Sequence, residues 1–312
     1  MKTSHAESAA GSTPLRGVLR YQESLGHHNS WRSGGVADRF YLPADLDDLV
    51  VFLKGLPAEE PLLWIGLGSN LLVRDGGFRG TVICTSNRLK GMEVLEQDRI
   101  EVQAGVPCAL VARFGADKGL TGAEFLAGIP GTMGGALAMN AGAFGGETWS
   151  LVESVTTVDR SGGLRTRASK EYAVAYRSVR GYPDEWFVAC TLQLAPGDGD
   201  EGRQKIKSLL ARRSETQPTN LPSCGSVFRN PEGDYAARLI EAAGLKGYRQ
   251  GDAQVSEKHA NFIVNVGAAR ADDIESVIDH VQAEVKRNSG IQLIPEVRIV
   301  GQSAKGGGNE KD

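Results

Sequence analysis

The stretch "GIPGTMGGALAMNAGAFGG", residues 128–146, is the part of the sequence that decides the fold. Gly and Ala occupy most positions from 134 to 146, so few side chains are available there to build a core. A large flat ligand would supply the missing surface while backbone amides meet its polar atoms. The alternative, close helix packing through small residues, explains a segment of this length less well.

A second glycine-rich stretch, "GLGSNLLV" at 66–73, follows an apolar run. Its glycines allow close backbone approach, and Ser69 and Asn70 offer side-chain hydrogen bonds to a phosphate. It is neither a Walker loop nor a G-x-G-x-x-G that opens a helix. Taken alone, a tight turn explains it equally well. Two such loops, roughly 60 residues apart, suggest one extended dinucleotide cofactor between two subdomains.

The composition excludes several classes of function. Hydrophobic residues make up 41% and charged residues 23% of the chain, with a net charge of −3. This charge gives no field that favours nucleic acid or an anionic membrane, and no apolar run reaches the roughly 18 residues of a membrane span. The four cysteines match neither a disulfide framework nor a zinc site. We therefore expect a cytoplasmic protein without metal, nucleic-acid or membrane partners.

Apolar periodicity and turn residues predict the elements. The predicted helices cover residues 44–54, 108–118, 203–213, 234–243 and 272–287. Predicted strands are 36–42, two within 61–84, a hairpin over 92–104, then 152–159, 186–194, 260–266 and a last pair from "IQLI" and "EVRIVG". Residues 195–202, "APGDGDEG", read as a linker.

The loop "LPSCGSVFRNP", residues 221–231, is bracketed by two prolines and reads as ordered. Cys224 and Ser226 both look like nucleophile candidates. The residues alone leave open whether this loop attacks a substrate, donates a proton or only turns the chain.

Taken together, these motifs resemble the UDP-N-acetylenolpyruvoylglucosamine reductase (MurB) family. The resemblance runs from "NSWRSGGVADRFYLP", near residue 29, to "PEVRIVG" at 295–301. It also includes "GLGSNLLVRDGGFRG", "YRSV", "PSCGSVFRNP" and "AGLKGYRQGDAQVSEKHANFIVN". So many long motifs in order are highly specific. Residues 178–200 leave no room for the family's extra insert, so the chain resembles the shorter, type II form.

The resemblance implies an α+β fold in which an FAD-binding region of the vanillyl-alcohol-oxidase (PCMH) type precedes an α+β substrate-binding domain. The expected organisation is a disordered tail 1–20, FAD subdomains 21–90 and 91–200, the substrate-binding domain 201–301 and a disordered tail 302–312. FAD is expected to be noncovalent. The implied FAD contacts are Gly66, Leu67, Gly68, Ser69, Asn70, Leu71, Gly128, Ile129, Pro130, Gly131, Thr132, Gly134, Gly135, Asn140 and Gly142.

The resemblance also implies the reaction. NADPH reduces the flavin, and the flavin passes hydride to the enolpyruvyl ether of UDP-N-acetylglucosamine, giving UDP-N-acetylmuramate for peptidoglycan synthesis. Because an enolate forms at a carboxylate, the site needs a cation there and a positioned acid. Arg177 matches the family's catalytic arginine, Ser226 its proton donor and Glu296 its third catalytic residue. The implied substrate contacts are Asn230, Lys258, His259 and Asn261.

Each of these residues also has an ordinary structural explanation. Arg177 alone would be a surface ion pair, Ser226 a turn serine and Glu296 a strand-edge carboxylate. Two other functions are considered: an FAD-dependent oxidase of an alcohol or sugar, and a catalytically silent flavin-binding or nucleotide-sensing module. Neither has a reason to keep all three residues together. We expect a reductase that acts as a monomer.

Overall fold

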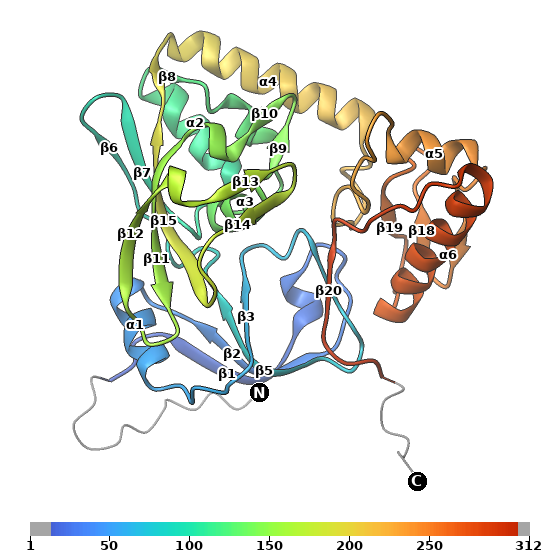
Figure 1. Cartoon of the computed structure of the whole chain (residues 1–312), viewed down its shortest axis with the longest axis horizontal. Helices are drawn as coiled ribbons and strands as arrows, with labels where there is room; N and C mark the ends of the chain where they lie inside the picture. Colours follow the sequence, from blue (N-terminus) through green and yellow to red (C-terminus); the bar gives the residue numbers. More distant parts are fainter. Residues whose placement is uncertain (1–13, 305–312) are drawn as a thin grey trace. The chain divides into compact units, whose positions relative to one another are not determined.

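The computed structural model describes residues 14–304, which divide into two compact units (Figure 1). The first unit holds residues up to Tyr21 together with Arg39–Leu67 and Thr81–Arg212. The second unit holds Gln22–Asp38, Gly68–Gly80 and the residues from Arg213 onward. The parts of the predicted tails at 1–13 and 305–312 lie outside the described residues. Val18, inside the predicted tail 1–20, begins the first strand.

A five-stranded antiparallel sheet forms the centre of the first unit. In spatial order its strands are β12 (Leu164–Ala168), β11 (Val152–Asp159), β15 (Glu185–Gln193), β7 (Arg99–Gln103) and β6 (Met92–Leu95). Alternate residues such as Ile100 and Val102 enter the core, as expected for a sheet with one buried face. The helices α2 (Cys108–Asp117) and α3 (Met133–Met139) add side chains to the same core, and α3 lies against β7 and β15 (Figure 1).

A second sheet has the strand order β1-β2-β5-β3. Its strands are β1 (Val18–Ser24), β2 (Val36–Leu42), β5 (Phe78–Cys84) and β3 (Leu62–Ile65). β3 and β5 are parallel, with Leu62 opposite Thr81. The helix α1 (Leu46–Lys54) begins after Asp45, whose carboxylate accepts a hydrogen bond from the Asp48 N–H. The side chain of Tyr41 stacks on Phe52 of α1 with ring centroids 3.6 Å apart.

Short elements complete the first unit. β8 (Leu120–Thr121) pairs with β16 (Ala195–Pro196), β9 (Gly142–Ala143) with β10 (Gly146–Glu147), and β13 (Ala173–Ala175) with β14 (Ser178–Arg180). The 3-10 turns η2 (Glu124–Gly128), η3 (Thr148–Ser150) and η4 (Ser169–Glu171) lie between them along the chain.

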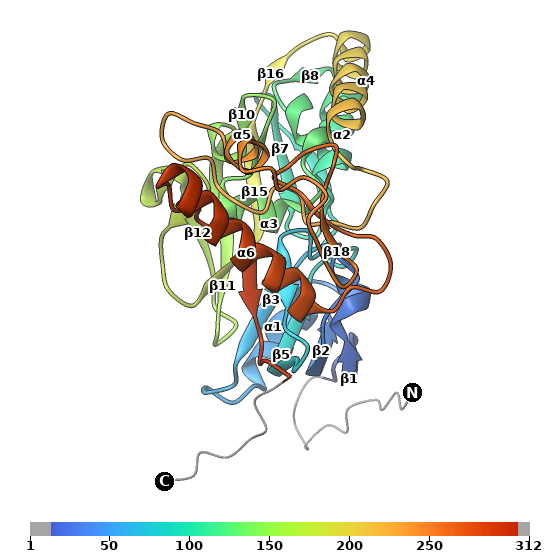
Figure 2. The same cartoon turned by 90° about the vertical axis from the view of Figure 1, so that its right-hand side faces the viewer.

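The second unit is built around helix α6 (Ala271–Ser289), which is labelled in Figure 2. This helix packs against β17 (Arg249–Gln250) and β18 (Ala253–Val255). The further elements are η1 (Leu25–His28), β4 (Leu71–Val73), α5 (Ala236–Ala242), β19 (Ile263–Asn265) and β20 (Arg298–Val300). Trp31 is fully buried in this core and donates from its indole N–H to the Ile263 carbonyl at 2.7 Å. β20 pairs in parallel with β4.

The mixed helix and strand content confirms the α+β class, and all five predicted helices are present with shifted ends. The predicted strand pair at the end of the chain is wrong. Residues 291–294 are not a strand, and β20 pairs with β4, far away in sequence. The predicted linker is also wrong, because β16 and the start of α4 (Gly199–Thr216) fill it. Asp198 starts that helix by accepting hydrogen bonds from the N–H groups of Asp200 and Glu201.

Candidate active site

The two glycine-rich loops that the sequence assigned to one cofactor meet inside the first unit, at Gly66 and Thr132. A Cβ on Gly66 would lie 2.1 Å from Thr132 Oγ1, so no other residue fits there without a shift. Thr132 Oγ1 is buried and has no hydrogen-bond partner among the described residues. A buried hydroxyl without a partner is unfavourable unless a ligand supplies one. This pair therefore fits a polar cofactor that passes close to the backbone.

Several glycines of 128–146 have a packing role instead. A Cβ on Gly128 would lie 2.4 Å from Phe144, and one on Gly146 would lie 2.5 Å from Phe125. Close packing of small residues, the alternative to a ligand, accounts for these two positions. Gly135 is different, because it is exposed on α3 and a Cβ there would have only Thr132 Oγ1 nearby, at 3.9 Å.

The other predicted cofactor residues are distributed over both units. Ile129 is buried, Pro130 and Leu67 are exposed, and the Gly131 carbonyl accepts the Cys108 N–H at 2.9 Å. Gly134 packs on Ala104, where a Cβ would be 2.9 Å from the alanine Cβ. Gly68, Ser69, Asn70 and Leu71 belong to the second unit. Gly68 has φ +62, and a Cβ there would lie 2.1 Å from the His28 carbonyl oxygen.

The side chain of Asn140 makes three hydrogen bonds to the protein. It ends α3 in the left-handed conformation, with φ 45, and is 1% exposed. Its Nδ2 donates to Glu147 Oε2 at 2.9 Å and to the Ala175 carbonyl at 3.2 Å. Its Oδ1 accepts the Trp149 N–H at 3.1 Å. The residue predicted to contact FAD thus ties together three segments of the first unit.

Arg177 lies at the tip of the β13–β14 hairpin, which is not among the strands predicted from the sequence. The alternating "AVAYRSV" is the signal that would have predicted it. Arg177 is half-buried and left-handed, with φ 51. Its Nη1 donates to the Asn140 carbonyl at 3.3 Å and its Nη2 to the Gly142 carbonyl at 3.1 Å. The arginine is therefore held against the glycine-rich segment by two backbone carbonyls.

Ser226 lies in the second unit, half-buried, directly after Gly225 with φ +72. The segment that follows it is held on both sides. The Val227 N–H donates to the Asn261 carbonyl at 2.9 Å, and the Val227 carbonyl accepts the Glu296 N–H at 2.7 Å. Ser226 and Glu296 are thus brought onto neighbouring, paired backbone segments.

Asn70 also connects to this pair. Its Nδ2 donates to the Glu296 carbonyl at 3.0 Å, and its own carbonyl accepts the Arg298 N–H at 3.1 Å. The start of β4 is therefore joined to the backbone of the predicted catalytic glutamate. Asn70 was predicted to contact FAD, and within the second unit it fixes Glu296.

Two predicted substrate residues use their side chains for hydrogen bonds to the backbone. Asn261 is 3% exposed, and it both accepts the Phe228 N–H at 3.0 Å and donates to the Phe228 carbonyl at 2.8 Å. Asn230 is exposed and accepts the Ala236 N–H at the start of α5, at 3.1 Å. Both contacts shape the chain around Ser226.

Lys258 and His259 lie beside one another in the same unit. Lys258 Nζ donates to the Ser214 carbonyl at 2.5 Å. The His259 ring packs edge-on against Phe262 at 4.8 Å, and its buried Nδ1 has no hydrogen-bond partner among the described residues. Burial lowers the pKa of His259, with a smaller contribution from Lys246, which favours the neutral ring.

Cys224 has no role as a nucleophile in this geometry. It is buried, and its thiol points to the carbonyls of Gly68 and Leu71 at 3.6 Å. Burial raises the pKa of Cys224 to about 12, so the reactive thiolate is not formed near neutral pH.

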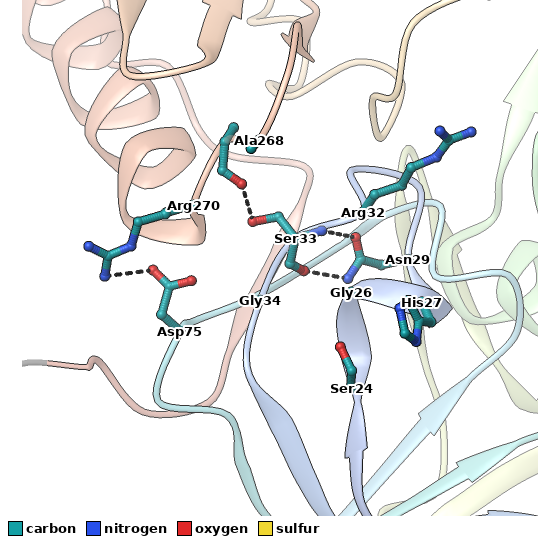
Figure 3. A pocket seen from close by; sticks show the side chains of 11 residues that line it. Ser24, Gly26, His27, Asn29, Arg32, Ser33, Gly34, Asp75, Ala268 and Arg270 are labelled. Atoms are coloured by element: carbon teal, nitrogen blue, oxygen red, sulfur yellow. Dashed lines mark hydrogen bonds and ion pairs between the residues drawn. The ribbon is translucent and has the colours of Figure 1, made fainter.

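A pocket of about 580 Å³ lies entirely within the second unit (Figure 3). Residues of 24–34, Asp75 and 268–270 line it. Its polar groups are mostly engaged: Ser33 Oγ donates to the Ala269 carbonyl at 2.8 Å, and Arg270 pairs with Asp75 at 3.5 Å. None of the predicted site residues lines this pocket. The described residues also contain no group of three or more His, Cys, Asp or Glu that could hold a metal, and no helix long and apolar enough to cross a membrane.

Two known protein families match separate parts of the chain. Residues 37–167 match the family described as "FAD binding domain", and residues 217–300 match "UDP-N-acetylenolpyruvoylglucosamine reductase, C-terminal domain". These matches confirm the predicted fold class, an FAD-binding region followed by an α+β domain.

Full-length relatives carry the same name. The chain is 62% identical to the UDP-N-acetylenolpyruvoylglucosamine reductase of Methylococcus capsulatus, over 95% of this chain and 98% of the relative. It is 58% identical to that of Alkalilimnicola ehrlichii, over 92% and 96% of the two chains. The solved reductase (MurB) of Thermus caldophilus matches with a TM-score of 0.76 at 32% identity, over 91% of this chain and 99% of that one. The chain therefore belongs to the UDP-N-acetylenolpyruvoylglucosamine reductase (MurB) family.

Proposed function

We propose that this chain catalyses the reaction of its family, the reduction of the enolpyruvyl ether of UDP-N-acetylglucosamine to UDP-N-acetylmuramate with NADPH and FAD. The observation that carries the proposal is the match to reductases at 62% and 58% identity over nearly the whole chain. The alternative, an oxidase of an alcohol or sugar, lacks this support, because both of these relatives are named as reductases.

FAD fits the residues of the first unit. Gly66 and Thr132 offer a close backbone approach and a buried hydroxyl that needs a partner. The exposed Gly135 on α3 leaves room for a flat ligand. Bound FAD supplies the hydride, which it takes from NADPH. We expect it to be held without a covalent bond.

Arg177 is proposed to bind the substrate carboxylate. Hydride addition to the terminal carbon of the enolpyruvyl group places negative charge on that carboxylate as an enolate. A guanidinium meets it with charge-assisted hydrogen bonds, which strengthen as the charge develops. The carbonyls of Asn140 and Gly142 fix the guanidinium beforehand, so little reorganisation is needed when the charge appears.

Ser226 is proposed to give a proton to the other carbon of the former double bond, and Glu296 to orient the enolate or relay protons. A serine hydroxyl is a weak acid, so it needs a neighbouring group that stabilises the charge left when its proton departs. The backbone bonds of Val227 to the neighbouring segments support the loop that carries Ser226. Asn230, Lys258, His259 and Asn261 are proposed to shape the surroundings of the substrate.

The remaining parts of the proposal concern the whole protein. We propose a cytoplasmic monomer whose small-molecule partners are NADPH and the enolpyruvyl sugar nucleotide. The domain boundaries at 90/91 and 200/201 stay predictions.

The test separates the two half-reactions in anaerobic rapid mixing. NADPH should bleach the yellow holoenzyme, and enolpyruvyl-UDP-N-acetylglucosamine should restore the colour without oxygen. In Ser226→Ala, bleaching should be unchanged, while recovery of the colour should slow by about 10²–10⁴. Ser223→Ala, in the same loop, is the matched control and should leave both rates unchanged.

Other outcomes would give a different answer. Colour that returns only with oxygen would identify an oxidase. Equal slowing of both half-reactions in Ser226→Ala would give Ser226 a structural role.

A further inference from the structure

Asn140 holds the hairpin that carries Arg177. Nδ2 of Asn140 donates to the carbonyl of Ala175, two residues before the arginine, and also to Glu147 Oε2. Oδ1 accepts the Trp149 N–H, so every polar atom of this buried amide already has a protein partner. Both N–H donors of the amide are therefore used, and only one lone pair of Oδ1 remains, on a side chain that is 1% exposed.

The backbone of Asn140 holds the guanidinium itself. Its carbonyl accepts from Arg177 Nη1, and the carbonyl of Gly142 accepts from Nη2. Asn140 ends α3 in the left-handed conformation, with φ 45, directly before the first of these carbonyls. Asn is one of the few residues besides Gly that adopt this conformation readily.

The hairpin is small, so its own strands contribute little to the placement of its tip. Its strands have three residues each, and a two-stranded hairpin of this size is marginal on its own. Residues 173–176 are exposed, so burial contributes little to their placement. Arg177 has φ 51, which an arginine adopts only when its surroundings hold it there.

We propose that Asn140 is a positioning residue for Arg177, and not a ligand of FAD. This inference rests on the proposed function, in which Arg177 binds the substrate carboxylate. Asn140 then acts only on the half-reaction with the enolpyruvyl substrate. The half-reaction with NADPH and the affinity for FAD do not depend on its side chain.

The test is Asn140→Gly, which keeps the left-handed backbone and removes all three side-chain bonds. Colour recovery with the enolpyruvyl substrate should slow by about 10–100-fold, the cost of a reacting group displaced by a fraction of an ångström to 1 Å. The rate of bleaching by NADPH and the dissociation constant for FAD should stay within about twofold of wild type, which is the scatter expected for an independent site. The flavin absorbance spectrum should be unchanged.

Asn87→Gly is the matched control. Asn87 is also left-handed, with φ 57, and is exposed, with no side-chain hydrogen bond to the described residues. It should leave both half-reactions unchanged. A second variant, Asn140→Asp, keeps the bond from the Trp149 N–H but places a carboxylate against Glu147. It should slow the substrate half-reaction, and adding Glu147→Gln should restore part of the rate.

Arg177→Ala distinguishes positioning from an independent effect. If Asn140 acts through Arg177, the double variant Asn140→Gly/Arg177→Ala is no slower with substrate than Arg177→Ala alone. Multiplicative losses would overturn the inference, and so would weakened FAD binding in Asn140→Gly with a normal rate at saturating FAD. If Arg177→Ala leaves the substrate half-reaction unchanged, the catalytic role proposed for Arg177 is wrong. This single variant therefore distinguishes a failure of the proposed function from a failure of the positioning role of Asn140.

Discussion

Replacing Asn261 by alanine should destabilise the second unit rather than weaken substrate binding directly. Asn261 is buried and bonds both to the N–H and to the carbonyl of Phe228, two residues beyond Ser226. Alanine would leave both backbone groups inside the protein without a partner.

The size of the effect follows from these two groups. A buried donor or acceptor left without its partner costs about 1–3 kcal/mol. Two such groups together would cost about 2–6 kcal/mol, and because the loop relaxes and admits water, we expect about 3 kcal/mol for Asn261→Ala. For a unit of this size that lowers the unfolding temperature by roughly 10 °C. Asn230→Ala removes one exposed bond, to the Ala236 N–H, and should cost no more than about 1 kcal/mol.

The assay is thermal unfolding of the two FAD-bound variants, followed by rapid mixing below their unfolding temperatures. Asn261→Ala should unfold well below Asn230→Ala and should have a reduced rate of colour recovery even at saturating substrate, because the segment of Ser226 has lost its support. The reasoning is refuted if Asn261→Ala unfolds at the wild-type temperature and only its KM for the sugar nucleotide rises.

Two other predictions concern α3 and His259. Gly135→Ala should stabilise the FAD-free protein by up to about 1 kcal/mol through helix propensity, and it should weaken FAD binding. Gly134→Ala should instead destabilise the protein by about 1–3 kcal/mol, because its Cβ would be 2.9 Å from Ala104 Cβ. Thermal unfolding and FAD titration measure both effects, and a Gly135→Ala protein less stable than wild type would contradict the open space described at Gly135. Because burial lowers the pKa of His259, the unfolded chain binds its proton more readily, so its contribution to stability is complete above about pH 6.5 and falls as the pH drops. His259→Gln should therefore show a shallower loss of stability than wild type between about pH 6.5 and 5 in urea unfolding, and parallel profiles would contradict it.

The sequence pattern was sufficient to predict an element whose structure depends mainly on its own residues. The apolar stripe of α6 predicted that helix to within two residues at each end, and Gly290, with φ 74, ends it as expected for a C-terminal glycine. The strand partner of β20 could not be predicted in this way. A three-residue strand carries no information about which distant segment it will pair with, and the nearest apolar run, residues 291–294, was the wrong choice.

The candidate site, too, could be predicted only in part. The sequence predicted that the loops of Gly66 and Thr132 serve one ligand, and the structure brings these two residues together. The individual roles of Asn70, Asn140 and Asn261 were not accessible. An asparagine amide binds a ligand, a backbone group or a carboxylate equally well, and only the tertiary fold decides which partner lies within reach.

The pairing of β4 with β20 has a consequence for synthesis on the ribosome. Arg74, directly after β4, bonds to the carbonyl of Gly301, 227 residues later. At about 5–20 residues per second, β4 waits roughly 10–45 s for its partner strand to be made. Its three apolar residues, which are buried in the finished protein, have no β20 to pair with for that time. The nascent chain therefore exposes the unpaired β4 to chaperones long before the second unit can complete its fold.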